Sequence, residues 1–127
     1  MRWGSWLALA GLNAFLSIAS GAFAAHALSA LGDAHGVGLM EKSARYQMYG
    51  AFALVVCAWL AERGLGGRLV AVAGWLHLAG VVLFCGALSA IALLGWPAGP
   101  VAPLGGSAML LGWGVLAWIG LRARREA

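Results

Sequence analysis

Nine ionisable, phenolic or amide side chains gather between residues 26 and 49 of a sequence that is otherwise strongly apolar. They are His26, Asp33, His35, Glu41, Lys42, Arg45, Tyr46, Gln47 and Tyr49. Glu41 and Arg45 stand four positions apart, as do Arg45 and Tyr49, so a helix would carry them as a ladder on one face. The first interpretation is a polar pocket in which cationic, hydroxyl, amide and imidazole groups capture a small anion, a lipid headgroup or a proton. The second interpretation is a Glu41–Arg45 ion pair that closes the top of a helical bundle with snorkelling side chains.

Two further polar residues, Asn13 and His77, lie inside apolar runs. An ionisable residue within a membrane span marks a functional site by default. For His77 we favour a neutral imidazole bonded to a backbone carbonyl or to Asn13. Helical rise separates His77 from His26 by ~20 Å along the membrane normal. The two histidines are therefore poorly placed to share a metal ion or a haem, and we expect neither a metal site nor a resident cofactor.

The sequence carries no signature of an enzyme. It has no nucleophile elbow, no HExxH or CxxCH motif and no phosphate-binding loop. Cys57 and Cys85 lie in apolar stretches, where cysteine behaves as a small buried hydrophobe. We therefore expect a protein that is not an enzyme.

The composition requires membrane-spanning helices to position these residues. Of the 127 residues, 63% are hydrophobic and 9% are charged, whereas soluble domains carry about 25% charged residues. Apolar runs predict a single domain over residues 1–127, with spans at about 4–30, 40–61, 69–94 and 101–121. Each span should be helical, because hydrocarbon satisfies no backbone groups. Short connections at 32–43, 62–68 and 95–101 predict an all-α, antiparallel bundle of four transmembrane helices.

The charged residues indicate orientation and do not indicate a nucleic-acid partner. The net charge is +4, but the basic residues form no continuous basic face. One side of the predicted bundle carries Arg2, Arg63, Arg68, Arg122, Arg124 and Arg125, and the other carries Lys42 and Arg45. The positive-inside rule then places both termini in the cytoplasm. Aromatic anchors are expected at the cytoplasmic interface (Trp3, Trp6, Trp59, Trp75 and Trp118) and at the outer one (Trp96, Tyr46 and Tyr49).

The first span offers two alternatives. Ala22, Phe23 and Ala24 resemble a signal-peptide cleavage site, but the apolar run continues beyond them, which favours an uncleaved span. Small or short side chains recur every four positions at Asn13, Ser17, Gly21 and Ala25. Such residues let helices approach closely, either within one chain or between copies of it.

Four segments resemble the YgdD-like family, small bacterial inner-membrane proteins of unknown function with a eukaryotic transmembrane relative. They are GAFAAHAL (21–28), ARYQMY (44–49), LAGVVLFCGALSAIALLG (78–95) and PLGGSAMLLGW (103–113). The resemblance implies a multi-pass, four-span protein of the bacterial inner membrane and implies no activity. It points to His26, Arg45, Tyr46, Gln47 and Tyr49 as a shared site, with Pro103, Gly105 and Gly106 setting the start of the fourth helix.

Two positions depart from the family pattern. The family often has Gly at the position of Ala24, and His at the position of Gly50. Without a histidine at Gly50, this chain cannot pair such a residue with His26, which argues against an obligatory site with two histidine ligands.

These observations lead to one functional hypothesis and two alternatives. The leading hypothesis is a non-enzymatic, oligomeric bundle that binds or passes a small solute or lipid through the outer polar cluster of His26, Glu41, Arg45, Tyr46, Gln47 and Tyr49. An accessory subunit that packs against a larger membrane complex is the first alternative. A redox subunit that binds haem or quinone, suggested by His77 and the tryptophans, is the second. The expected partners are the lipid bilayer and either further copies of the chain or a larger complex.

Overall fold

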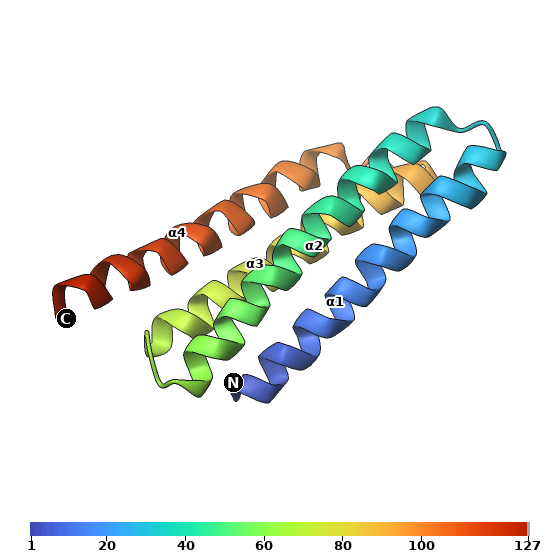
Figure 1. Cartoon of the computed structure of the whole chain (residues 1–127). Coiled ribbons are helices and arrows are strands. Elements are labelled where there is room, and N and C mark those ends of the chain that lie inside the picture. The colour runs from blue at the N-terminus through green and yellow to red at the C-terminus, as the bar shows by residue number, and fades with distance from the viewer. Residues whose placement is uncertain (127) are drawn as a thin grey trace.

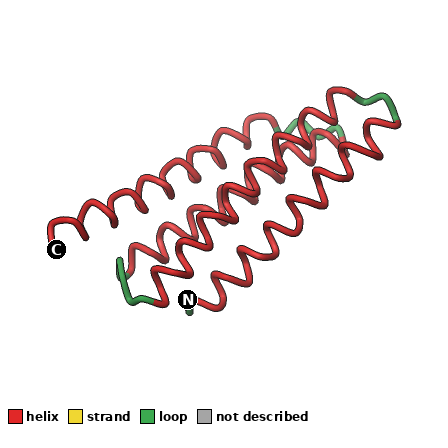
Figure 2. The backbone as a smooth tube through the Cα atoms, in the orientation of Figure 1, coloured by secondary structure: helices red, strands yellow, loops and turns green. Residues whose placement is uncertain are grey.

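The structure is a computed structural model that describes residues 1–126, and all regular elements in that range are helical. Four long helices run side by side as an elongated bundle (Figure 1). Short connections join them, as the tube in Figure 2 shows. The elements are α1 (Trp3–Phe23), the π-helix η1 (Ala24–Leu28), α2 (Ala34–Glu62), α3 (Arg68–Leu94), the 3₁₀-helix η2 (Gly99–Val101) and α4 (Ala102–Glu126).

Consecutive helices are antiparallel, as predicted. Both termini and the α2–α3 connection lie at one end of the bundle, and the other two connections lie at the opposite end (Figure 1). Within the described chain, three helical segments are long and apolar enough to cross a membrane, namely Trp3–Leu28, Arg68–Leu94 and Gly99–Arg125. The helix outside this set is α2, whose polar residues in the ladder lower its hydropathy.

The second helix begins earlier than the sequence indicated. We expected a connection over residues 32–43, but helix α2 already starts at Ala34. The reason is local: the Asp33 carboxylate accepts a hydrogen bond from the Gly36 amide at 2.9 Å, which caps the helix. Glu41 and Arg45 consequently lie in the interior of a helix rather than in its first turns.

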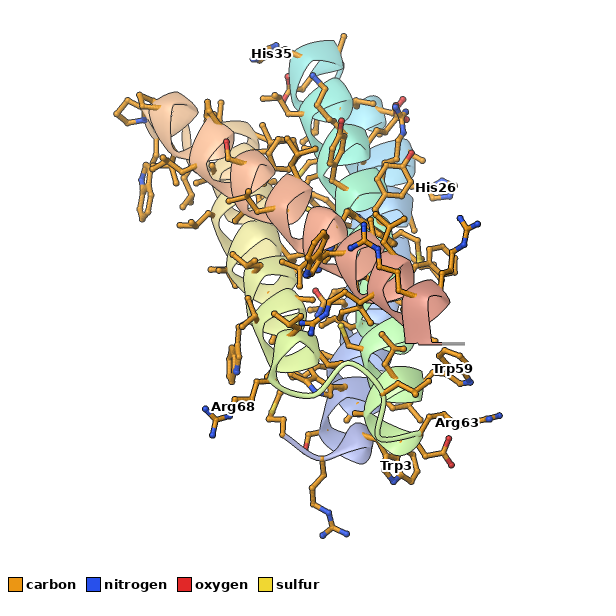
Figure 3. All side chains as sticks on the ribbon, turned by 90° about the vertical axis from the view of Figure 1, so that its left-hand side faces the viewer. Trp3, His26, His35, Trp59, Arg63 and Arg68 are labelled. Carbon is orange, nitrogen blue, oxygen red and sulfur yellow. The ribbon has the colours of Figure 1, made fainter. Side chains whose placement is uncertain are left out.

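Trp6 corrects a second expectation. We predicted an interfacial anchor, yet Trp6 is only 1% exposed and belongs to the core. Its ring lies where a Cβ on Gly74 of α3 would stand, and it packs edge-on against Trp75 with 5.8 Å between ring centroids. The absence of a side chain at Gly74 lets the indole fill this space. Trp3 and Trp59 are exposed at the same end (Figure 3).

The buried face of α1 follows the ordinary helical period. Ala10, Asn13, Ser17 and Ala24 are buried, whereas Ala25, which the four-residue spacing had predicted, is exposed. Residues spaced strictly four apart gradually rotate around a helix that has 3.6 residues per turn. The next buried position on this face is therefore Ala24 and not Ala25. The α1–α2 contact is close here: the Ser17 hydroxyl donates to the Ala44 carbonyl at 2.6 Å.

The contact between α3 and α4 depends on glycine. A Cβ on Gly105 of α4 would collide with the backbone of Phe84, and a Cβ on Gly80 of α3 would collide with Met109. Pro103 lies in the first turn of α4, where its missing amide hydrogen costs no helical hydrogen bond. These small residues allow two helix backbones to approach closely, which compensates for the weak driving force for helix association in lipid.

Candidate functional site

A pair of buried amide side chains joins α1 to α2 near the middle of the bundle. Asn13 is 8% exposed and Gln47 is 9% exposed. The Asn13 amide donates to the Leu9 carbonyl at 2.9 Å, one turn earlier on its own helix. The Gln47 amide nitrogen donates to the Asn13 side-chain oxygen at 3.4 Å. Of the predicted cluster, Gln47 is therefore the member that turns inward.

A second polar contact lies one helical turn from Gln47 and joins α2 to α3. The Ser43 hydroxyl donates to the Cys85 carbonyl at 3.3 Å, and the Cys85 thiol donates back to the Ser43 carbonyl at 3.3 Å. The Ser43 and Ser89 hydroxyl oxygens are 3.5 Å apart. Cys85 is free and buried, as is Cys57, so both cysteines have the expected burial. Together with Asn13 and Gln47, these groups form what we call the polar seam.

A groove of about 500 Å³ lies between α1 and α3 and reaches the polar seam. Leucine and valine side chains form most of its walls. Asn13, Gln47, Cys85 and Ser89 of the polar seam line it together with Ser20, and Gly86 leaves open space on the α3 side. The apolar lining residues are Leu9, Leu12, Leu16, Leu78, Val81 and Val82. The groove thus combines apolar walls with a few uncharged hydrogen-bonding groups, the usual character of a small-molecule site.

His77 occupies a separate, closed position between α3 and α4. Its side chain is fully buried, and Nδ1 lies 2.8 Å from the Ala73 carbonyl oxygen. Because a carbonyl can only accept, Nδ1 carries the hydrogen and Nε2 is the acceptor. Nε2 is the one buried side-chain nitrogen or oxygen atom within the described range without a hydrogen-bond partner. The partner found is the backbone carbonyl, one of the two that we expected, and not Asn13.

The neighbours of His77 hold the ring in place. Trp113 packs edge-on against it, with 5.2 Å between ring centroids and an interplanar angle of 86°. Gly112 lies directly over the ring, where a Cβ would come within 2.5 Å of the imidazole. This packing leaves no room for a large planar cofactor at His77.

The remaining members of the predicted cluster stay on the surface. Tyr46 contacts Tyr49, with 5.4 Å between ring centroids, and Phe84 of α3 at 4.7 Å. Glu41 and Arg45 are both exposed, and no ion pair joins them. His26 is exposed and points away from the bundle (Figure 3). The structure therefore brings together Tyr46 with Tyr49 and Gln47 with Asn13, but it does not gather the whole set around one cavity.

The backbone around His26 holds a feature that the sequence pattern did not indicate. Residues Ala24–Leu28 form a π-helix, which widens the end of α1 by one residue per turn. Ala24 and Leu28 are both buried against Met40 of α2, so the wider turn keeps residues four apart on the face that contacts α2. Small side chains permit this turn, but the hydropathy pattern does not distinguish it from an α-helix.

The ionisable side chains do not assemble into a metal site. Among the side chains of residues 1–125, no three from His, Cys, Asp or Glu are close enough to hold a metal ion. The polar seam, in contrast, lines a cavity: it contributes amides, a hydroxyl and a thiol to the groove between α1 and α3, which we take as the candidate site.

Comparison with known proteins places the chain in a family. Residues 20–106 match the model described as "Protein of unknown function (DUF423)". The chain is 36% identical over 113 residues to the UPF0382 membrane protein YwdK of Bacillus subtilis, covering 85% of this chain and 89% of the relative. It is 33% identical over 118 residues to a UPF0382 membrane protein of Haemophilus influenzae, covering 89% and 90%.

A UPF0382 membrane protein of Staphylococcus aureus is 34% identical over 109 residues. No solved structure matches the chain. The family match confirms the resemblance drawn from the four motifs, and three candidate membrane-spanning segments agree with it. The chain belongs to the DUF423 family and is a multi-pass bacterial membrane protein of unknown function.

Proposed function

We propose that this protein is a non-enzymatic membrane protein that binds a small, uncharged, lipid-soluble molecule in the groove between α1 and α3. The observation that carries the proposal is the Asn13–Gln47 pair, which places hydrogen-bonding amides beside an apolar groove of about 500 Å³. Buried amides within a membrane protein are costly unless they are bonded. An apolar groove lined by two such amides is suited to a ligand with a polar head and an apolar body.

The free hydrogen-bonding capacity of Gln47 defines the chemistry of the ligand. Among the described side chains, Gln47 makes one hydrogen bond, through one of its two amide hydrogens. Its carbonyl oxygen and second amide hydrogen remain for an alcohol, an ester or a ketone. No Asp, Glu, Lys, Arg or His lines the groove, so nothing there would balance the charge of an ion. An amide, hydroxyl and thiol set without a neighbouring acid or base also favours binding over catalysis.

The proposal includes four membrane crossings with both termini in the cytoplasm. α2 has 29 residues, enough for a span at 1.5 Å per residue, and it packs between α1 and α3. Its polar residues Ser43 and Gln47 face these neighbours rather than lipid. Six arginines lie near the end with both termini, against Lys42 and Arg45 near the other, which supports this orientation.

Filling the groove tests the proposal. Gly86 lines the groove, and a Cβ there meets nothing within 4 Å, so Gly86→Leu should occupy the cavity without disturbing the helices. Gly114→Leu is the matched control, because Gly114 also has open space but lies outside the groove. The probe is a short-chain monoacylglycerol, compared with the fatty-acid anion of the same chain length, and bound probe is counted by native mass spectrometry.

We expect the wild type and Gly114→Leu to retain the monoacylglycerol and to exclude the anion, and Gly86→Leu to lose the monoacylglycerol. Gln47→Leu should bind it roughly 3- to 10-fold more weakly, as expected for one hydrogen bond. Equal binding by Gly86→Leu and Gly114→Leu would refute the assignment of the groove. Tighter binding of the anion would refute its proposed preference for uncharged ligands.

A further inference from the structure

A second groove, of about 550 Å³, opens at the end of the bundle that carries both termini. It lies between the C-terminal halves of α2 and α4 and is bordered by the start of α3. Its walls are apolar, with Val56 and Leu60 from α2, Leu69 from α3, and Leu116 and Ile119 from α4. This groove shares no lining residue with the one between α1 and α3, so the two can be tested independently.

Basic and aromatic side chains surround the mouth of this second groove. Arg122 lines it directly and is exposed. Trp59 also lines it, and the guanidinium carbon of Arg63 lies 5.5 Å from the centre of a Trp59 ring. Figure 3 shows Trp59 and Arg63 together at this end of the bundle. Among the side chains of residues 1–125, no carboxylate forms an ion pair with Arg122 or Arg63.

The charge at this end is one-sided. The chain places Arg2, Arg63, Arg68, Arg122, Arg124 and Arg125 here, and its acidic residues at this end are Glu62 and Glu126. An anionic lipid surface attracts basic residues that lie next to a membrane, and a guanidinium binds phosphate through two parallel hydrogen bonds. Tryptophan prefers the level of the headgroups. The second groove therefore combines a basic side chain, Arg122, an interfacial aromatic side chain, Trp59, and apolar walls.

We infer that this second groove binds an anionic phospholipid, with an acyl chain between α2 and α4 and the phosphate on the Arg122 guanidinium. A zwitterionic lipid has the same acyl chains but carries no net negative charge that the arginines could bind. The apolar walls would bind the acyl chain of the lipid, and Arg122 would give the groove its preference for a negatively charged headgroup. The inference does not depend on the proposed ligand of the groove between α1 and α3.

The test compares two lipids and four forms of the full chain in nanodiscs, with retained lipid counted by native mass spectrometry. The lipids are dioleoylphosphatidylglycerol and dioleoylphosphatidylcholine. Arg122→Gln removes the charge that lines the groove. Arg124→Gln is its control, because it removes the same charge from the same helix end but does not line the groove. Gly120→Leu fills the groove, since a Cβ at Gly120 meets nothing within 4 Å.

We expect the wild type to retain the phosphatidylglycerol in preference to the phosphatidylcholine. Arg122→Gln should weaken that retention about tenfold or more, as expected for the loss of a charge-assisted hydrogen bond to the phosphate. Arg124→Gln should weaken it by no more than about fivefold, the diffuse effect of one basic residue near an anionic surface. Gly120→Leu should lose the lipid. Equal losses in Arg122→Gln and Arg124→Gln would show diffuse attraction and overturn the site, as would full retention by Gly120→Leu or equal retention of both lipids.

Discussion

Gly112 and Gly114 lie two residues apart on α4, and substitution by alanine should lower the stability of the bundle at Gly112 but not at Gly114. An added Cβ at Gly112 would come within 2.5 Å of the His77 ring, whereas a Cβ at Gly114 would meet nothing within 4 Å. His77 cannot withdraw easily, because its ring is fully buried and Nδ1 is bonded to Ala73. Gly112→Ala should therefore destabilise the bundle, and Gly114→Ala should leave it unchanged or stabilise it.

The expected magnitude follows from two terms. Replacing glycine by alanine within a helix stabilises by about 0.5–1 kcal/mol, and this term applies to both variants. Overpacking a filled core costs about 1–3 kcal/mol, and this term applies to Gly112→Ala alone. The difference between the two free energies of unfolding should therefore be about 1–3 kcal/mol. Reversible unfolding by sodium dodecyl sulfate in mixed micelles, followed by tryptophan fluorescence, measures it.

A double-mutant cycle identifies the cause of the difference. His77→Ala removes the ring, so Gly112→Ala in that background should cost no more than Gly114→Ala does. If the two glycine variants unfold at the same free energy in the wild-type background, then His77 does not pack under Gly112 as described. If the cost of Gly112→Ala persists without the ring, the clash lies elsewhere.

Two further predictions concern single hydrogen bonds. Ser17→Ala should lower the free energy of unfolding by about 0.6 kcal/mol, and by at most about 1.7, because it deletes the 2.6 Å bond to the Ala44 carbonyl in a membrane setting. The same micelle titration measures this, with the exposed Ser5→Ala as the control; equal effects would contradict a role for the bond. Asp33→Ala should destabilise the start of α2 by about 1 kcal/mol and speed hydrogen exchange at Gly36, while Asp33→Asn should retain most of the cap. Unchanged exchange at Gly36 in Asp33→Ala would rule out the cap.

Hydropathy predicts the helices where apolar residues define their ends. The expected spans 69–94 and 101–121 lie within α3 and close to α4, because glycine and proline follow or precede these apolar runs. The start of α2 at Ala34 instead depends on Asp33, whose capping bond involves backbone amides and needs no apolar residue. Hydropathy does not predict the π-helix either, because an apolar run has the same mean hydropathy whether its turns are α-helical or π-helical.

The candidate site was only partly predictable for a geometric reason. Neighbouring residues on a helix point about 100° apart, so Gln47 could not face the same way as Tyr46. The spacing alone places Gln47 with Ser43, one turn earlier, on the inner face. Its pairing with Asn13 depends on how α1 is rotated against α2, and the close Ser17–Ala44 contact fixes that rotation. This contact involves a backbone carbonyl, which a list of side chains does not show.

The hydrogen bonds between α1 and α2 also bear on how the chain enters the membrane. α2 is the helix whose own composition is least suited to hydrocarbon, yet Ser17 and Asn13 of α1 bond to its backbone and to Gln47. Because the connection between them is short, we expect the two helices to enter the membrane as one hairpin, with these polar groups of α2 already bonded to α1. A chain without α1 would leave the Ala44 carbonyl and the Gln47 side chain of α2 without these hydrogen bonds.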